Sequence, residues 1–153
     1  MTENPQHAAQ GIALTCVFDA RRDLVFRAWT TPEHFAYWFG GGLEVPVDRM
    51  TMDVRPGGAW SLVMRAPDGR DLPFSGVYQE IAAPERLEFT ITDSATPTDL
   101  EDEIVRVTLT DLQGRTEMVF RQDGGNLTAE QYKQAEAGWA GFFDRLTELL
   151  ARA

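Results

Sequence analysis

The chain opens on an alternation of apolar and polar positions that is typical of a strand with one buried face. Ile12, Leu14, Cys16 and Phe18 share one parity, which is the period-two spacing of a β-strand. Similar runs recur further along, separated by short segments rich in Pro, Gly and Asp, at residues 43–54, 59–65, 72–81, 87–91, 103–112 and 115–121. Because short turns join these runs, we expect neighbouring strands to be antiparallel.

Two short helices are predicted directly after the first strand. Apolar residues at helical spacing indicate a helix over residues 21–30. A second helix begins at Pro32, passes through Trp38 and ends at the glycine run 40–42. These helices interrupt the series of strands near its start.

The last element is a long amphipathic helix over residues 128–151. Thr128 and Gln131 have the spacing of a capping box. One wide apolar stripe follows the helix: Tyr132, Ala135, Trp139, Phe142, Phe143, Leu146, Leu149 and Leu150. A stripe of this width needs a large apolar partner, and the concave face of the sheet is the only candidate of sufficient size.

The order of these elements predicts an α+β protein with a helix-grip fold. We expect a curved antiparallel sheet of about six to seven strands around the long C-terminal helix, with two short helices after the first strand. Residues 1–10 are predicted to be a mobile lead-in and residues 11–153 a single domain, a size at which a substantial core can form. A sheet that grips a helix leaves space between them, which is a natural ligand site.

Charge and composition narrow the classes of function. The net charge of −10 repels phosphate backbones and anionic lipid, so we expect no nucleic-acid partner and no membrane association. The polar start is unlike a signal peptide and no apolar run has membrane length, which favours the cytoplasm. With one cysteine, Cys16, and the separated histidines His7 and His34, we expect no metal and no other cofactor.

The aromatic residues are candidates for lining a pocket between helix and sheet. Each ring alone is explained by a core, but together they exceed what a minor pocket needs, so some are expected to line the cavity, where flat rings suit an aromatic guest. Gly138 and Gly141 are predicted to leave volume beside the rings of the long helix. The predicted ligand-binding rings are Trp38, Phe39, Trp60, Phe74, Tyr78, Phe89, Trp139 and Phe143.

Glu80 is the candidate acid of the pocket. It shares the parity of Phe74 and Tyr78, so its carboxylate can face the same interior, where desolvation would raise its pKa and permit acid–base chemistry. The alternative, which the usual behaviour of strand carboxylates favours, is an ion pair with an Arg on a neighbouring strand. No other set of residues has the spacing of a catalytic motif.

Seven local strings occur in an order that matches a known family. They are FDARRDLVFRAWT with PEH at 18–34, WFG at 38–40, DVRPGGAW at 53–60, MRAPDG at 64–69, GVYQEI at 76–81, PERLEFT at 84–90, and GW with Leu146 at 138–146. From about residue 12 to residue 150 the chain resembles the START-like (SRPBCC) superfamily, and within it the subfamily named for the activator of the heat-shock-protein-90 ATPase. The resemblance implies the helix-grip fold, and its strings belong mostly to the scaffold.

Three functions are compatible with the sequence. The first is binding of a small apolar or aromatic molecule, which the resemblance and the aromatic inventory favour over catalysis. The second is a small cyclase-type or hydrolase-type enzyme that uses pocket acids such as Glu80. The third is a chaperone-associated interaction module with a role in stress response, which rests on the subfamily name alone. A sheet edge can also support a homodimer.

Overall fold

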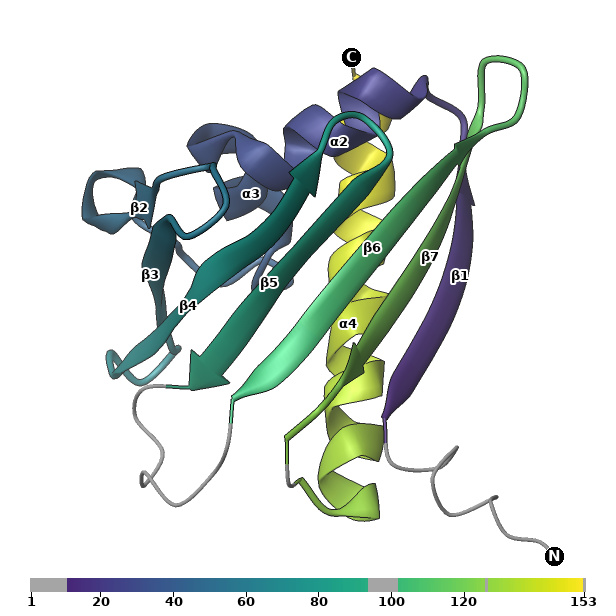
Figure 1. The fold of residues 1–153 in the computed structure, drawn as a ribbon. Helices are drawn as coiled ribbons and strands as arrows, with labels where there is room; N and C mark the ends of the chain where they lie inside the picture. Colours follow the sequence, from purple (N-terminus) through teal and green to yellow (C-terminus); the bar gives the residue numbers. More distant parts are fainter. Residues whose placement is uncertain (1–10, 94–101, 126, 153) are drawn as a thin grey trace, which may run out of the picture.

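The computed structural model describes residues 11–93, 102–125 and 127–152, which form one curved antiparallel sheet with the helices on one of its faces (Figure 1). The sheet has seven strands in the order β1-β7-β6-β5-β4-β3-β2. In chain order the elements are β1 (Ile12–Phe18), α2 (Arg22–Thr30), α3 (Pro32–Trp38), η1 (Val47–Arg49), β2 (Thr51–Met52), β3 (Ala59–Arg65), β4 (Asp71–Ala82), β5 (Arg86–Asp93), β6 (Glu103–Asp111), β7 (Thr116–Asp123) and α4 (Ala129–Ala151). The predicted α+β helix-grip architecture is confirmed.

Helix α4 runs lengthwise along one face of the sheet (Figure 1). It begins with the predicted capping box, in which the Thr128 side chain accepts from the Gln131 N–H and the Gln131 side chain accepts from the Thr128 N–H. Its buried residues are Tyr132, Trp139, Phe143, Leu146 and Leu150, which all belong to the predicted stripe. Within the described ranges, no helix is both long enough and apolar enough to cross a bilayer.

Helices α2 and α3 lie beside the C-terminal end of α4 (Figure 1). They are fixed to each other because the Trp38 indole N–H donates to the Ala28 carbonyl at 2.9 Å in a buried position. The start of α2 is tied to the sheet, since the buried Thr116 hydroxyl donates to the Ala20 carbonyl at 2.7 Å. These bonds satisfy polar groups that would otherwise be buried without partners.

The prediction of one strand over residues 43–54 is wrong. Val47–Arg49 forms a 3-10 turn, Thr51–Met52 pairs with β3, and Glu44 makes an isolated bridge to Arg65 at the end of β3. Pro46 is the residue that precedes the 3-10 turn. Because proline has no N–H for a strand ladder, it ends the extended segment that the apolar residues alone suggested.

Trp60 and Gly76 together join three strands of the sheet. The two residues are cross-strand partners on β3 and β4, and the Trp60 indole N–H reaches over to the Thr90 carbonyl on β5 at 3.0 Å. A Cβ at position 76 would lie 1.8 Å from that carbonyl oxygen and 2.6 Å from the Trp60 nitrogen. Glycine is therefore required here, and the ring covers the gap it leaves.

Candidate functional site

Aromatic rings in mutual contact fill the interior between α4 and the sheet. The Trp139 ring centroid lies 4.6 Å from that of Phe120 and 5.5 Å from that of Phe39. Phe39 and Phe35 stack at 4.7 Å. We call the buried rings the aromatic cluster, and none of its members is more than 5% exposed: Trp29, Phe35, Trp38, Phe39, Trp60, Phe89, Phe120, Trp139 and Phe143. A guest cannot enter the middle of such packing without displacing rings.

The structure gathers almost all of the predicted site residues around this cluster. Six of them are members of it: Trp38, Phe39, Trp60, Phe89, Trp139 and Phe143. Tyr78 is buried against it, with its ring 6.1 Å from that of Phe89. Phe74 lies at its edge, half-buried, with its ring 5.9 Å from that of Phe39. The predicted rings thus form one connected apolar body.

Glu80 does not join these rings. Its carboxylate accepts from the Arg86 guanidinium at 2.9 Å, and the Glu80 side chain is 38% exposed. The pairing of β4 with β5 shifts by one residue between Tyr78 and Glu80, because Tyr78 lies opposite Phe89 whereas Glu80 lies opposite Glu88. This β-bulge reverses the parity of the strand, so the alternation that aligned Glu80 with Tyr78 no longer holds beyond the bulge.

One side of α4 carries half-buried residues at the edge of the cluster. We call the half-buried residues Ala135, Gly138 and Phe142 the uncovered flank. The segment after α3 covers its C-terminal end, since a Cβ on Gly41 would lie 3.3 Å from the Phe142 ring. One turn earlier, a Cβ on Gly138 would have no neighbouring atom within 4 Å. A side chain at position 138 would therefore project into open space, as it would at the exposed Gly141.

A chain of buried polar side chains runs beside the rings, from β6 through β7 to α4. Trp139 Nε1 donates to Gln122 Oε1 at 2.7 Å, and Gln122 Nε2 donates to Glu103 Oε1 at 3.3 Å. The Tyr132 hydroxyl donates to Glu103 Oε2 at 2.9 Å. We call these four residues the polar chain, and each is at most 5% exposed. Because every member has a partner, the chain fixes the N-terminal half of α4 against the sheet.

Burial sets the protonation behaviour of the polar chain. Desolvation raises the pKa of the Glu103 carboxyl, and the hydrogen bonds from Tyr132, Gln122 and the Gly125 N–H offset that rise only in part. Burial also raises the pKa of the Tyr132 hydroxyl, with the neighbouring Glu103 carboxylate adding to the effect. Tyr132 consequently remains a hydrogen-bond donor throughout the neutral pH range.

Comparison with known proteins identifies the family of this chain. The family model of activator of Hsp90 ATPase homolog 1-like proteins matches residues 19–151. The chain belongs to this AHSA1-like family. The resemblance that the sequence strings suggested is thus confirmed, whereas no curated protein matches the chain.

Solved structures share the fold of this chain. Protein CV1439 from Chromobacterium violaceum is 27% identical, with 92% of this chain and 96% of that chain covered and a TM-score of 0.81. An AHSA1-like protein from Aeromonas hydrophila is 24% identical over 90% of each chain, with a TM-score of 0.73. DynU16, from the dynemicin biosynthetic locus, is 19% identical over 93% of this chain and 47% of its own, with a TM-score of 0.75. The last two likenesses concern the fold alone.

The polar chain of this AHSA1-like protein was missed in the sequence, although its signal is present there. Glu103 has the parity of Val105 and Val107, which face the core from β6. Gln122 likewise has the parity of Met118 and Phe120 on β7. A polar residue that continues an inward-facing apolar series predicts a buried polar group, and two such residues on adjacent strands predict a pair.

Replacing Glu103 by glutamine is expected to change how stability depends on pH. Because the folded-state pKa of Glu103 is raised, its favourable contribution is complete below the unfolded-state pKa and is lost as the pH rises through the folded-state pKa. The free energy of unfolding of Glu103→Gln should therefore equal that of the wild type near pH 4, and should exceed it increasingly towards pH 8. Urea titrations of both proteins at several pH values measure this difference, and a difference independent of pH would contradict the burial argument.

Proposed function

We propose that this AHSA1-like protein binds a small hydrophobic or aromatic molecule between α4 and the sheet, at the uncovered flank. The observation that supports the proposal is that the half-buried Gly138, next to the buried Trp139, would have no neighbouring atom within 4 Å of an added Cβ. An apolar surface that is partly exposed and continuous with a core offers a guest both area to bury and ring faces to stack on.

The surroundings of the flank indicate how a guest is oriented. Phe142 and Phe74 are half-buried and both rings contact Phe39, so they border the flank from α4 and from β4. Trp139 lies next to Gly138 in the helix and carries the hydrogen bond to Gln122. A guest on the flank therefore meets apolar rings on its sides and the polar chain beyond them. Burial of apolar area at about 25 cal/mol per Å² makes micromolar affinity attainable after the costs of association.

The enzymatic alternative has less support from the described residues. This alternative rested on Glu80. Glu80 follows the bulge on β4, and its carboxylate accepts a hydrogen bond from Arg86. Glu103 is the buried acid, but its two carboxylate oxygens accept from Gln122 and Tyr132. A carboxylate that is occupied in this way stabilises the helix–sheet contact and has no free oxygen directed at a substrate.

The chaperone-associated alternative also has less support. A protein partner needs a contiguous apolar patch. Among the described residues, the exposed large apolar side chains are Val17 on β1, Val47 on η1, Val77 on β4 and Leu112 in the turn between β6 and β7. A homodimer through a sheet edge stays a prediction.

The location we propose is the cytoplasm. The chain has one cysteine, Cys16, which is half-buried on β1. Burial raises the pKa of its thiol, which keeps the group protonated and unreactive. A protein without disulfides and without a reactive thiol suits a reducing compartment.

Titration with a panel of polycyclic aromatics, flavonoids and fatty acids tests the proposed function. We expect at least one class to quench tryptophan fluorescence and to raise the melting temperature, because a guest on the flank lies beside Trp139 and stabilises the folded state. Saturable binding whose affinity increases with the apolar ring area of the guest would support the proposal. Failure of every class to bind the wild-type protein, or binding that leaves tryptophan emission unchanged, would contradict it.

A further inference from the structure

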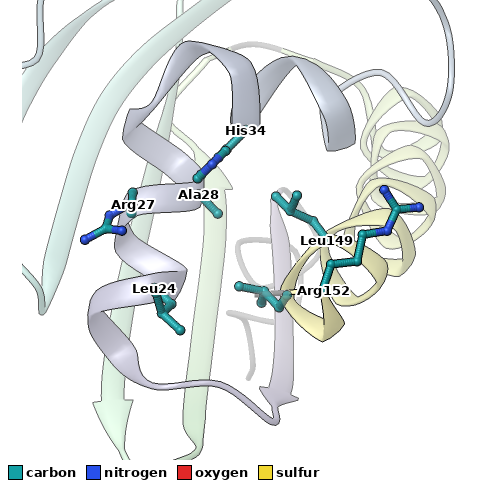
Figure 2. A pocket seen from close by; sticks show the side chains of 7 residues that line it. Leu24, Arg27, Ala28, His34, Leu149 and Arg152 are labelled. Carbon is teal, nitrogen blue, oxygen red and sulfur yellow. The ribbon is translucent and has the colours of Figure 1, made fainter.

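A cavity lies at the C-terminal end of α4 and includes none of the residues of the uncovered flank. It lies where the C-terminal end of α4 faces α2 and the start of α3 (Figure 2). Its volume is about 300 Å³. We call its lining residues the cationic groove: Leu24, Arg27, Ala28, His34, Leu149, Leu150 and Arg152. This volume is at the lower end of the range for small-molecule sites, roughly 300–1,000 Å³.

The groove combines an apolar floor with a basic rim. Ala28 and Leu150 are buried, and Leu24 and Leu149 are half-buried and packed against the core. Figure 2 shows Ala28 and Leu149 extending into the space between the helices, whereas Arg27 extends from the far side of α2 and Arg152 from the end of α4. Both arginines are exposed and His34 is half-buried. Their long, flexible side chains can turn their charged ends towards a ligand while their stems cover apolar surface.

The basic side chains of the rim form no ion pairs among the described residues. None of the lining residues is acidic, and across the described part of the chain neither Arg27, His34 nor Arg152 forms an ion pair. Arg152 lies over the Tyr37 ring at 5.0 Å, a contact that leaves its charge in place.

Three acids lie near these basic residues in sequence. Asp23 is 3.5 Å from Arg21, Glu33 is adjacent to His34 in the first turn of α3, and Glu148 accepts from the Tyr37 hydroxyl at 3.4 Å. Because none of these acids lines the groove, the side chains that do line it favour an anion.

We propose that the cationic groove binds a small amphipathic carboxylate, an aliphatic or aryl acid of modest size. Its apolar part would lie on Leu24, Ala28 and Leu149, and its carboxylate would meet the basic rim. Charge complementarity favours the anion, and the volume suits a small guest. This site is separate from the flank beside Gly138, so it does not depend on the proposed function.

Titration of isotope-labelled protein with sodium octanoate tests this site, with amide chemical shifts as the readout. We expect saturable shifts at Leu24, Ala28, His34 and Leu149. Octanol, which has the chain without the charge, and acetate, which has the charge without the chain, should each bind at least about tenfold more weakly, because each lacks one half of the recognition.

Variants separate the basic rim from general charge effects. Arg27→Gln combined with Arg152→Gln should weaken octanoate binding at least about tenfold, since two charge-assisted contacts are lost. The matched control, Arg86→Gln with Arg121→Gln, removes the same charge from side chains that are 58% and 60% exposed and do not line the groove, and it should leave binding unchanged. Equal binding of octanol and octanoate, or equal weakening in both double variants, would overturn the proposal. Shifts confined to residues 135–142 would also overturn it, and would instead support the flank.

Discussion

Replacing Trp139 by alanine is expected to lower the free energy of unfolding by about 3–5 kcal/mol, the range for removing a large buried aromatic side chain. Trp139 is 5% exposed, and its ring contacts Phe120 and Phe39 in the centre of the aromatic cluster. Truncation would leave a cavity that these rings cannot fill. It would also leave the buried Gln122 oxygen without the donor that now lies 2.7 Å away.

Denaturant titration measures this loss, and Trp139→Phe is its matched control. Phenylalanine keeps an aromatic ring in the cluster but cannot donate to Gln122, so we expect a smaller loss of about 1–3 kcal/mol. The difference between the two variants separates ring packing from the hydrogen bond. A change near zero for Trp139→Ala would show that α4 does not pack on the sheet through this residue.

Replacing Gly138 by leucine is expected to remove ligand binding at the flank while the protein stays folded. A Cβ at this position meets no atom within 4 Å, so the new side chain enters the open space that the guest would occupy. We expect affinity for any guest found in the titration to fall at least about tenfold. Leucine in a helix is more favourable than glycine by roughly 0.8–1 kcal/mol, so loss of binding would not reflect unfolding.

Gly141→Leu is the matched control for this variant. Gly141 lies on the same helix, is exposed, and also has no atom within 4 Å of an added Cβ. It therefore gains the same helix propensity without filling the flank. Calorimetric titration of both variants should show normal affinity in Gly141→Leu and weak affinity in Gly138→Leu. Equal affinity of the two variants would show that the guest does not bind beside Gly138.

The architecture was predictable because its signals are local and periodic. The stripe of α4 contains all five of its buried residues, and the capping box at Thr128 fixes where the helix begins. Tight turns between alternating runs specify antiparallel pairing. The one strand predicted wrongly, over residues 43–54, contains Pro46, a local signal that the apolar pattern outweighed.

The candidate site was predictable only in part, because its geometry depends on contacts between elements. The aromatic residues were expected to line a cavity, but how closely their rings pack follows from the curvature of the sheet. The bulge between Tyr78 and Glu80 has no signature in the alternation of β4, and it decides which way Glu80 points. The cationic groove joins α2 to the end of α4, elements far apart in sequence, so no local pattern predicts it.

The most direct test of ligand binding at the flank is to observe which protons of the protein lie next to a bound guest. Intermolecular nuclear Overhauser effects, recorded with the tightest-binding molecule from the titration, give this contact map. We expect cross-peaks from the guest to the Phe142 and Phe74 rings and to the Ala135 methyl group. Cross-peaks to Leu24 and Leu149 alone, or to residues on the outer face of the sheet, would contradict it.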